Sequence, residues 1–272
     1  MKKRINPVIK PVIEAFQTAY IQTKQFATNP NSAINGLLVM GDAGTGKSHY
    51  VKSALRDAGV QSQVEYLKGG TITAASFYVK LFLNRSSQRI IVLDDVDIIN
   101  HPEKNKIVPM ILGAVEEGQD RQVGWNTAKR NSLMEEYDVP MNFNFNGKVI
   151  VITNYTLDDI AEKMKQWKQA FSSRFNHVSC IFNHEQKYMY TKYLIEECDM
   201  LGQNCLVHRY KVKDKKVNGY PKDDIQEAMD FIDDNYMNFS EITPRVAVKV
   251  ADTIHYHQDL TTKRIMLNSL VK

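Results

Sequence analysis

The chain has 272 residues, of which 43% are hydrophobic and 24% are charged, proportions that are ordinary for globular proteins and exclude a disordered or fibrous chain. Its net charge of +4 is compatible with nucleic-acid binding but does not establish it. Because no long apolar run occurs, and two prolines instead of an apolar segment follow the basic N-terminus, we expect neither a membrane span nor a secretory leader, and a cytoplasmic location.

Predicted strands and helices alternate through the first two thirds of the chain. Apolar side chains recur at helical spacing over residues 8–27, which predicts an amphipathic helix before the first strand. Alternation of this kind implies a parallel sheet covered on both faces, with ligands at the carboxyl ends of its strands. The predicted strands are residues 34–40, 63–67, 89–95, 148–154 and 178–182, and the helices between them are 48–58, 71–83, 106–117 with Pro109 in its first turn, and 158–171. Residues 118–147 form a polar insertion.

The pattern changes at about residue 184, where helical spacing replaces the alternation. We therefore expect a core domain over residues 1–183 and a small helical domain over residues 184–272. Three helices are predicted there, marked by Tyr190 to Leu201, Ile225 to Tyr236 and Ile242 to Ile254, with a hairpin over residues 207–217. The three cysteines lack the C-x-x-C spacing of a zinc site and are interpreted as small buried hydrophobes.

Residues 41–48 reproduce the phosphate-loop pattern G-x-x-x-x-G-K-[ST] at every constrained position, between a predicted strand and a predicted helix. Glycines allow backbone N–H groups to surround phosphates, the lysine can reach the β and γ phosphates, and the serine hydroxyl can bind Mg²⁺. The sequence therefore predicts a site for ATP with Mg²⁺. The residues expected to contact the nucleotide are Gly41, Asp42, Ala43, Gly44, Thr45, Gly46, Lys47, Ser48 and His49.

Polar residues also end two other predicted strands. Asp94 and Asp95 follow a buried strand, and we assign Asp94, together with Ser48, to Mg²⁺ and Asp95 to the attacking water. Asn154 ends the next strand and can hydrogen-bond the γ phosphate or the water. The alternatives are a solvated turn for the two aspartates and an ordinary turn residue for Asn154.

Five separated motifs occur in a fixed order along the chain. They are residues 41–48, Leu93-Asp94-Asp95, Asn154 after Val149-Ile150-Val151-Ile152, Ser172-Ser173-Arg174-Phe175, and Thr243-Pro244-Arg245. With these motifs the chain resembles the AAA+ ATPases, whose core is a phosphate-loop α/β fold with a five-stranded parallel sheet and a small C-terminal helical lid. Two further segments, Lys68-Gly69-Gly70-Thr71 and Trp125-Asn126-Thr127, resemble small phage-type AAA ATPases, which would place the protein in a host cytoplasm.

The resemblance implies a role for each matched residue and an ATP-hydrolysing activity. It makes Asn154 sensor 1, Arg174 an arginine finger that reaches a neighbour's γ phosphate, and Arg245 the sensor 2 arginine. A finger supplied by a neighbour requires a homo-oligomer, a ring or spiral that we expect to be a hexamer. The alternatives are a surface ion pair for Arg174 and a local pair at the helix N-terminus for Arg245.

One position departs from the resembled family, in which many members carry glutamate where this chain has Asp95. The shorter side chain holds its carboxylate about one methylene further from the water. This difference predicts slow hydrolysis and leaves a nucleotide-gated switch open.

Two segments are candidates for contact with nucleic acid or with a central pore. Lys68 follows the second predicted strand, although a plain turn also explains the glycines after it. The insertion 118–147 combines cations with an aromatic side chain suited to base stacking, although a solvated loop is the alternative. A basic and aromatic strip at residues 207–213 has the same ambiguity. The insertion residues concerned are Arg121, Trp125, Lys129 and Arg130.

The sequence therefore favours an ATP-dependent machine for nucleic-acid transactions, such as helicase loading or DNA remodelling in replication, with DNA and a replication protein as partners. The alternatives are a protein-remodelling ATPase of the chaperone or unfoldase type, and a nucleotide-switched scaffold.

Overall fold

The computed structural model describes residues 5–29, 32–118, 121–126, 129–205, 209–212, 215–257 and 259–271. The chain divides into two compact units. One unit, the sheet unit, comprises Ala15–Asp42 and Lys47–Ile181. The other, the helical unit, comprises Met1–Glu14, Ala43–Gly46 and Phe182–Lys272, so the first residues group with the C-terminal part of the chain and not with the predicted core domain.

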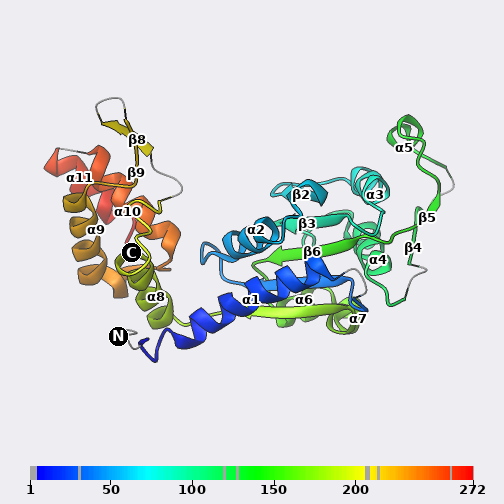
Figure 1. Cartoon of the computed structure of the whole chain (residues 1–272), viewed down its shortest axis with the longest axis horizontal. Coiled ribbons are helices and arrows are strands. Elements are labelled where there is room, and N and C mark those ends of the chain that lie inside the picture. Colours follow the sequence, from blue (N-terminus) through cyan, green and yellow to red (C-terminus); the bar gives the residue numbers. More distant parts are fainter. Residues whose placement is uncertain are drawn as a thin grey trace. The chain divides into compact units, whose positions relative to one another are not determined.

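The sheet unit is built on five parallel strands, as predicted, and their order in the sheet is β2-β3-β6-β1-β7 (Figure 1). Every residue of β1 and β3 is buried, which explains why these strands are continuous apolar runs without alternation. The fifth strand begins earlier than the predicted residue 178 and follows Arg174 directly. The bounds are β1 (Gly36–Gly41), β2 (Val64–Lys68), β3 (Ile90–Asp94), β6 (Lys148–Thr153) and β7 (Phe175–Cys180).

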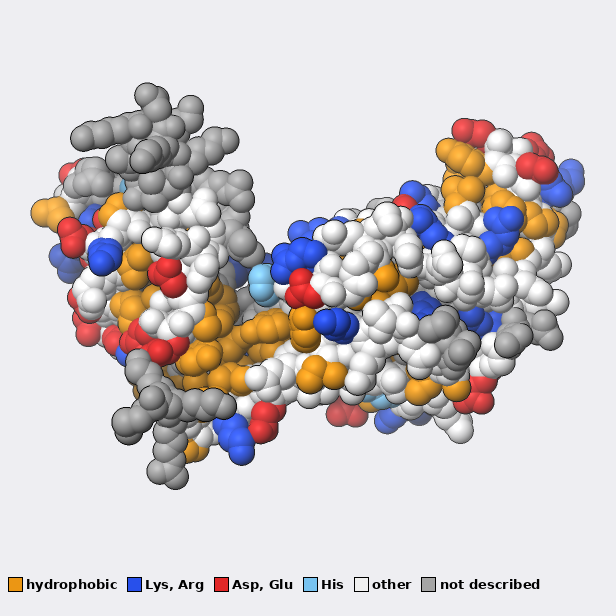
Figure 2. All heavy atoms as spheres, in the orientation of Figure 1, with side chains coloured by type: hydrophobic (Ala, Val, Ile, Leu, Met, Phe, Trp, Pro, Cys, Tyr) orange, Lys and Arg blue, Asp and Glu red, His pale blue; other side chains and the backbone are white. Residues whose placement is uncertain are grey.

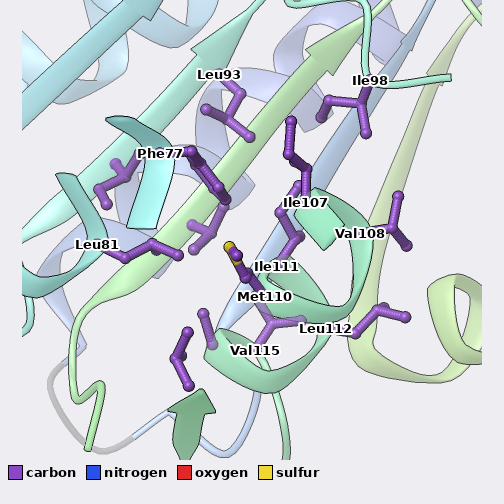
Figure 3. Close-up of a cluster of buried hydrophobic side chains, with 14 of the residues drawn as sticks. Phe77, Leu81, Leu93, Ile98, Ile107, Val108, Met110, Ile111, Leu112 and Val115 are labelled. Carbon is purple, nitrogen blue, oxygen red and sulfur yellow. The ribbon is translucent and has the colours of Figure 1, made fainter. Parts of the chain in front are cut away.

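Helices α3 and α4 bury much of the sheet's apolar surface. Figure 3 shows Phe77 and Leu81 of α3 meeting Ile107 and Ile111 of α4 beside Leu93 of β3. All five side chains are almost completely buried. Besides a short helix in the insertion, the helices of this unit are α1 (Lys10–Thr28), which begins in the other unit, α2 (Lys47–Asp57), α3 (Ala74–Leu83), α4 (Lys104–Ala114), α6 (Leu157–Lys163) and α7 (Lys168–Arg174). Short 3-10 turns lie at Gln61–Gln63 and Lys165–Trp167.

Two details of the predicted helices are wrong. The single helix expected over 158–171 is two helices separated by the turn η2 (Lys165–Trp167). The buried side chains on either side of that turn keep a four-residue and seven-residue spacing, so the helical periodicity of the sequence does not reveal the break. Pro109 lies inside α4 and not in its first turn, because the helix already begins at Lys104.

The insertion 118–147 is a packed hairpin and not a solvated loop. Strands β4 (Gln122–Gly124) and β5 (Asn142–Asn144) pair antiparallel, with the short helix α5 (Ser132–Glu136) between them. Figure 1 shows this arm extending from the sheet beyond α3 and α4. Figure 2 shows hydrophobic side chains mixed with charged ones on the arm's outer surface.

The hairpin buries two of the residues predicted to contact nucleic acid. Arg121 is 5% exposed and donates hydrogen bonds to the carbonyls of Ala114 and Gly147, both at 2.9 Å. Trp125 is 7% exposed and packs against Tyr78, with ring centroids 5.5 Å apart. Pairing of β4 with β5 turns both side chains toward the core, so both residues are removed from the candidate contacts.

The helical unit contains a fourth helix that was not predicted. Leu260 and Ile265 of α11 are largely exposed, so this helix has no complete apolar face that periodicity could detect. The expected hairpin is present as β8 (Arg209–Val212) paired with β9 (Lys215–Asn218), whereas the side chains of the basic strip at 207–213 lie outside the described residues. The helices are α8 (His184–Glu196), α9 (Lys222–Asn235), α10 (Pro244–Tyr256) and α11 (Leu260–Asn268), with a 3-10 turn at Tyr236–Asn238.

No helix in the described ranges is both long enough and apolar enough to cross a membrane.

Candidate functional site

The predicted phosphate loop begins where β1 ends. Gly41 has φ +145°, and a Cβ atom there would lie 2.1 Å from the carbonyl oxygen of Cys180 on the adjacent strand β7. Only glycine avoids both the strained backbone and this collision. The first glycine of the motif is therefore required by the approach of two strands as well as by the turn.

Lys47, the first residue of α2, is 6% exposed. Its ammonium group donates to the carbonyl oxygens of Gly41 and Asp42, both at 2.7 Å, and to Oδ1 of Asn154 at 2.9 Å. Burial lowers the pKa of Lys47, because water no longer solvates the charged form fully. The three oxygens hold the ammonium at the mouth of the loop.

Ser48 and Asp94 meet directly. The serine hydroxyl donates to Oδ1 of Asp94 at 2.6 Å, and Asp94 is only 2% exposed at the carboxyl end of β3. The two residues assigned to Mg²⁺ are thus adjacent, although they are far apart in the sequence.

Asn154 joins Lys47 to Asp95. Its amide nitrogen donates to Oδ1 of Asp95 at 2.8 Å, while its amide oxygen accepts from Lys47. Asp95 has φ +60°, a left-handed conformation that is uncommon outside glycine and that turns the chain sharply after β3. Lys47, Asn154 and Asp95 form one network from three separate elements, as expected of a hydrolytic site at the carboxyl edge of a sheet.

Residues 37–178, slightly more than half of the chain, match the family described as "ATPase family associated with various cellular activities (AAA)". The chain belongs to the AAA family of ATPases. The matched interval contains the phosphate loop, both aspartates, Asn154 and Arg174.

Other similarities are more distant. An uncharacterized 36.7 kDa protein of Enterobacteria phage T4 is 25% identical over 229 residues, which is 82% of this chain but only 65% of the phage protein. Among solved structures, domain III of the Thermotoga maritima replication initiation protein DnaA covers 99% of the chain and is itself covered completely, with 15% identity and a TM-score of 0.47. A Thermotoga maritima RuvB mutant covers 96% of the chain over 70% of its own length, with 11% identity and a TM-score of 0.49.

Membership of the AAA ATPases implies that Mg²⁺ binds beside the nucleotide. A buried carboxylate oxygen without a hydrogen-bond partner tests whether the residues present fit the ion. Oδ2 of Asp94 and the hydroxyl of Tyr66 are both buried, and neither has a hydrogen-bond partner among the described residues. Lys52 Nζ lies 4.0 Å from the same Oδ2. A buried carboxylate oxygen beside a serine hydroxyl is the oxygen donor set that Mg²⁺ prefers, so the residues present fit the ion.

Arg174 lies in the sheet unit at the opposite end of the strands from the phosphate loop. It ends α7, and the residue after it, Phe175, pairs with Gly36 at the start of β1. The guanidinium contacts Glu116 at 2.6 Å and donates to the carbonyl of Leu112 at 3.1 Å. Within one chain Arg174 therefore forms the ion pair that was its alternative interpretation, and its role as a finger stays a prediction.

The other predicted residues do not join the network. His49 and Lys68 are exposed, and Lys68 pairs in register with Asp94 on β3. Arg130 forms an ion pair with Asp138 at 3.4 Å, and Lys129 is exposed. Arg245 lies in the first turn of α10 in the helical unit. Their roles in nucleotide or nucleic-acid binding stay predictions.

Sequence reasoning missed Tyr66 and Lys52. Tyr66 was interpreted only as a strand residue, yet burial and the charge of Asp94 raise the pKa of Tyr66. Lys52 lies 4.6 Å from the centre of the Tyr66 ring. No local pattern marks these residues, because Tyr66 comes to Asp94 through the pairing of β2 with β3, and Lys52 comes to it from α2.

Proposed function

We propose that this AAA ATPase hydrolyses ATP with Mg²⁺ in a homo-oligomer and acts in nucleic-acid transactions. The observation that carries the proposal is the network in which Asn154 bridges Lys47 to Asp95 beside the contact between Ser48 and Asp94. It combines a cation for the phosphates, a donor set for a metal and a carboxylate for water within one site.

Each residue then has a chemical task. Lys47 offsets negative charge on the β and γ phosphates, and Ser48 with Asp94 would hold the metal. When bound, Mg²⁺ neutralises charge that develops on the phosphate oxygens. Asn154 occupies one oxygen of Asp95, which leaves Oδ2 to orient and deprotonate the attacking water.

The position of Arg174 supports assembly of the chain into a homo-oligomer. Five residues of β1 separate the Arg174 end of the sheet from Gly41, or roughly 17 Å along an extended strand. That separation exceeds the reach of an arginine side chain, so Arg174 can serve as a finger only for another protomer's nucleotide. Its partly exposed ion pair with Glu116 is weak, so little free energy is needed to break it.

The metal assignment predicts the behaviour of Asp94→Asn. We expect the variant to bind ATP with nearly the same affinity with and without Mg²⁺, because the neutral amide no longer attracts the ion, and to hydrolyse ATP about 100-fold or more slowly. Titration of a fluorescent ATP analogue, with Mg²⁺ and then with EDTA, measures this. Asp158→Asn, the same change at an exposed position, is the control. Normal Mg²⁺ dependence in Asp94→Asn would remove the assignment.

The nucleic-acid role is supported by an exposed cation, Lys68, at the carboxyl edge of the sheet next to Asp94 in register. Hydrolysis measured alone, with single-stranded DNA and with an unfolded polypeptide tests the role. Asp95→Asn, which loses the general base, is the blank that corrects for contaminating ATPases. We expect stimulation by DNA; stimulation by polypeptide alone would favour the protein-remodelling alternative, and tight binding without turnover would favour a switch.

A further inference from the structure

A pocket that none of the predicted site residues lines is formed by α4, α6 and the turn after α6 in the sheet unit. Its volume is about 430 Å³. The first turn of α4, the last residue of α6 and the turn η2 form it. The residues on which its chemistry depends are Lys104, Asn105, Lys163, Lys165, Gln166 and Trp167, here named the lysine-tryptophan pocket.

The pocket is rich in positive charge. None of its three lysines forms an ion pair with a carboxylate in the described part of the chain, and no acidic side chain from that part lines it. The ammonium of Lys104 donates to the carbonyl of Ile99 at 3.2 Å. The carboxylate of Asp159 is hydrogen-bonded by Thr156 in the capping box of α6, and it attracts Lys163 without forming a close ion pair. Three cations with two neutral amides suit a polyanion with hydrogen-bonding groups, such as a nucleic-acid strand.

Trp167 adds a surface for an unpaired base. The indole is half-buried: part of it packs against the apolar core and part lines the pocket. An aromatic side chain anchored in this way is already oriented, so a base can stack on it without ordering the ring first. Stacking requires a base that is free of its duplex neighbours, which favours a single strand over a duplex.

Both sides of the pocket lead directly to the hydrolysis network. Lys104 follows Asp95 by nine residues, and Lys163 follows Asn154 by nine. The two connecting segments are tied together, because the amide of Asn100 donates to the hydroxyl of Tyr155 at 2.6 Å. Lys163 also lies 5.1 Å from the centre of the Tyr155 ring, and Tyr155 is the residue after Asn154. A phosphate that draws Lys163 away from this ring therefore acts on the neighbour of Asn154.

We propose that the lysine-tryptophan pocket binds single-stranded nucleic acid and that its occupancy raises the rate of ATP hydrolysis through Tyr155 and Asn154. This inference rests on the proposed nucleic-acid role and names the place on the chain where the strand binds.

Intrinsic fluorescence provides a direct test, because the chain contains two tryptophans and the other, Trp125, is buried. Titration of the full chain, loaded with ADP, with oligothymidine should quench Trp167, and Trp167→Phe should remove the quenching. The double substitution Lys163→Glu and Lys165→Glu should weaken oligothymidine binding about tenfold or more and reduce the salt dependence of that binding. Fluorescence anisotropy of a labelled oligothymidine measures both effects. The ratio of hydrolysis rates with and without oligothymidine should fall to near one.

The control is Lys222→Glu with Lys249→Glu, which makes the same charge change at two exposed lysines of the helical unit and should leave binding unaltered. Thermal unfolding and sedimentation of every variant exclude misfolding and altered assembly. If the wild type binds oligothymidine and the Lys163 and Lys165 variant binds equally well, the pocket is wrong while the proposed role stands. If the wild type binds no oligothymidine, the role itself fails. If the substitutions dissociate the oligomer, the pocket is a protomer interface and the inference is overturned.

Discussion

Lys47→Ala is expected to weaken ATP binding by about 100-fold or more, which corresponds to the loss of roughly 3 kcal/mol in charge-assisted hydrogen bonds. The ammonium is buried and held by three oxygens at the mouth of the loop, so it is positioned for phosphate before the nucleotide arrives. Isothermal titration with ATP and Mg²⁺ measures the loss.

Two further variants serve as controls for Lys47→Ala. Lys222→Ala removes an exposed lysine of the helical unit and should leave ATP affinity unchanged. Lys47→Arg keeps the charge but cannot keep the geometry of all three hydrogen bonds, so its affinity should lie between those of wild type and Lys47→Ala. Thermal unfolding shows whether the alanine variant is folded. A folded Lys47→Ala protein with undiminished ATP affinity would contradict the assignment of the phosphate loop.

Arg174→Ala should leave ATP affinity unchanged and lower hydrolysis by about 10³-fold, the usual effect of an arginine finger. The reason is positional: Arg174 adjoins the start of β7, at the end of the sheet opposite its own phosphate loop. Steady-state turnover at saturating ATP, on protein shown to be assembled, is the measurement.

Glu116→Gln distinguishes a finger from a structural ion pair. The pair is partly exposed, with side chains 28% and 45% accessible, and such pairs are worth about 0–1 kcal/mol. If the pair only stabilises the fold, removal of either partner should have the same small effect. If Arg174 is a finger, Glu116→Gln should keep hydrolysis and only Arg174→Ala should lose it.

Oligomers mixed from two variants test directly whether Arg174 acts on the nucleotide of a neighbouring protomer. Arg174→Ala protomers keep an intact phosphate loop, and Lys47→Ala protomers keep the arginine. In mixed oligomers some interfaces join an intact loop to an intact arginine, so turnover should reappear although each variant alone is inactive. Mixtures that demonstrably co-assemble and still show no turnover would leave Arg174 as the partner of Glu116.

The local sequence was sufficient for the sheet and the centre of the site. Strands buried on both faces must be continuous apolar runs, and β1, β3 and β6 could be located for that reason. The carboxyl ends of parallel strands share one edge, so residues that end neighbouring strands were expected to meet. Asp95 and Asn154 do so. The phosphate loop was equally predictable, because its glycines, lysine and serine fall within eight consecutive residues in a fixed pattern.

Tertiary structure alone decided which polar and aromatic residues face solvent. Arg121 and Trp125 have the composition of a nucleic-acid contact, but the pairing of β4 with β5 buries them. Conversely, the lysine-tryptophan pocket combines residues of α4 with residues of η2. Tyr66 and Asp94 lie on two different strands, which are adjacent only in the folded sheet. Sequence periodicity shows which side chains share one face of a helix or strand. Whether that face is exposed, and which element it pairs with, depends on segments distant in the chain. That information enters only when the chain has packed.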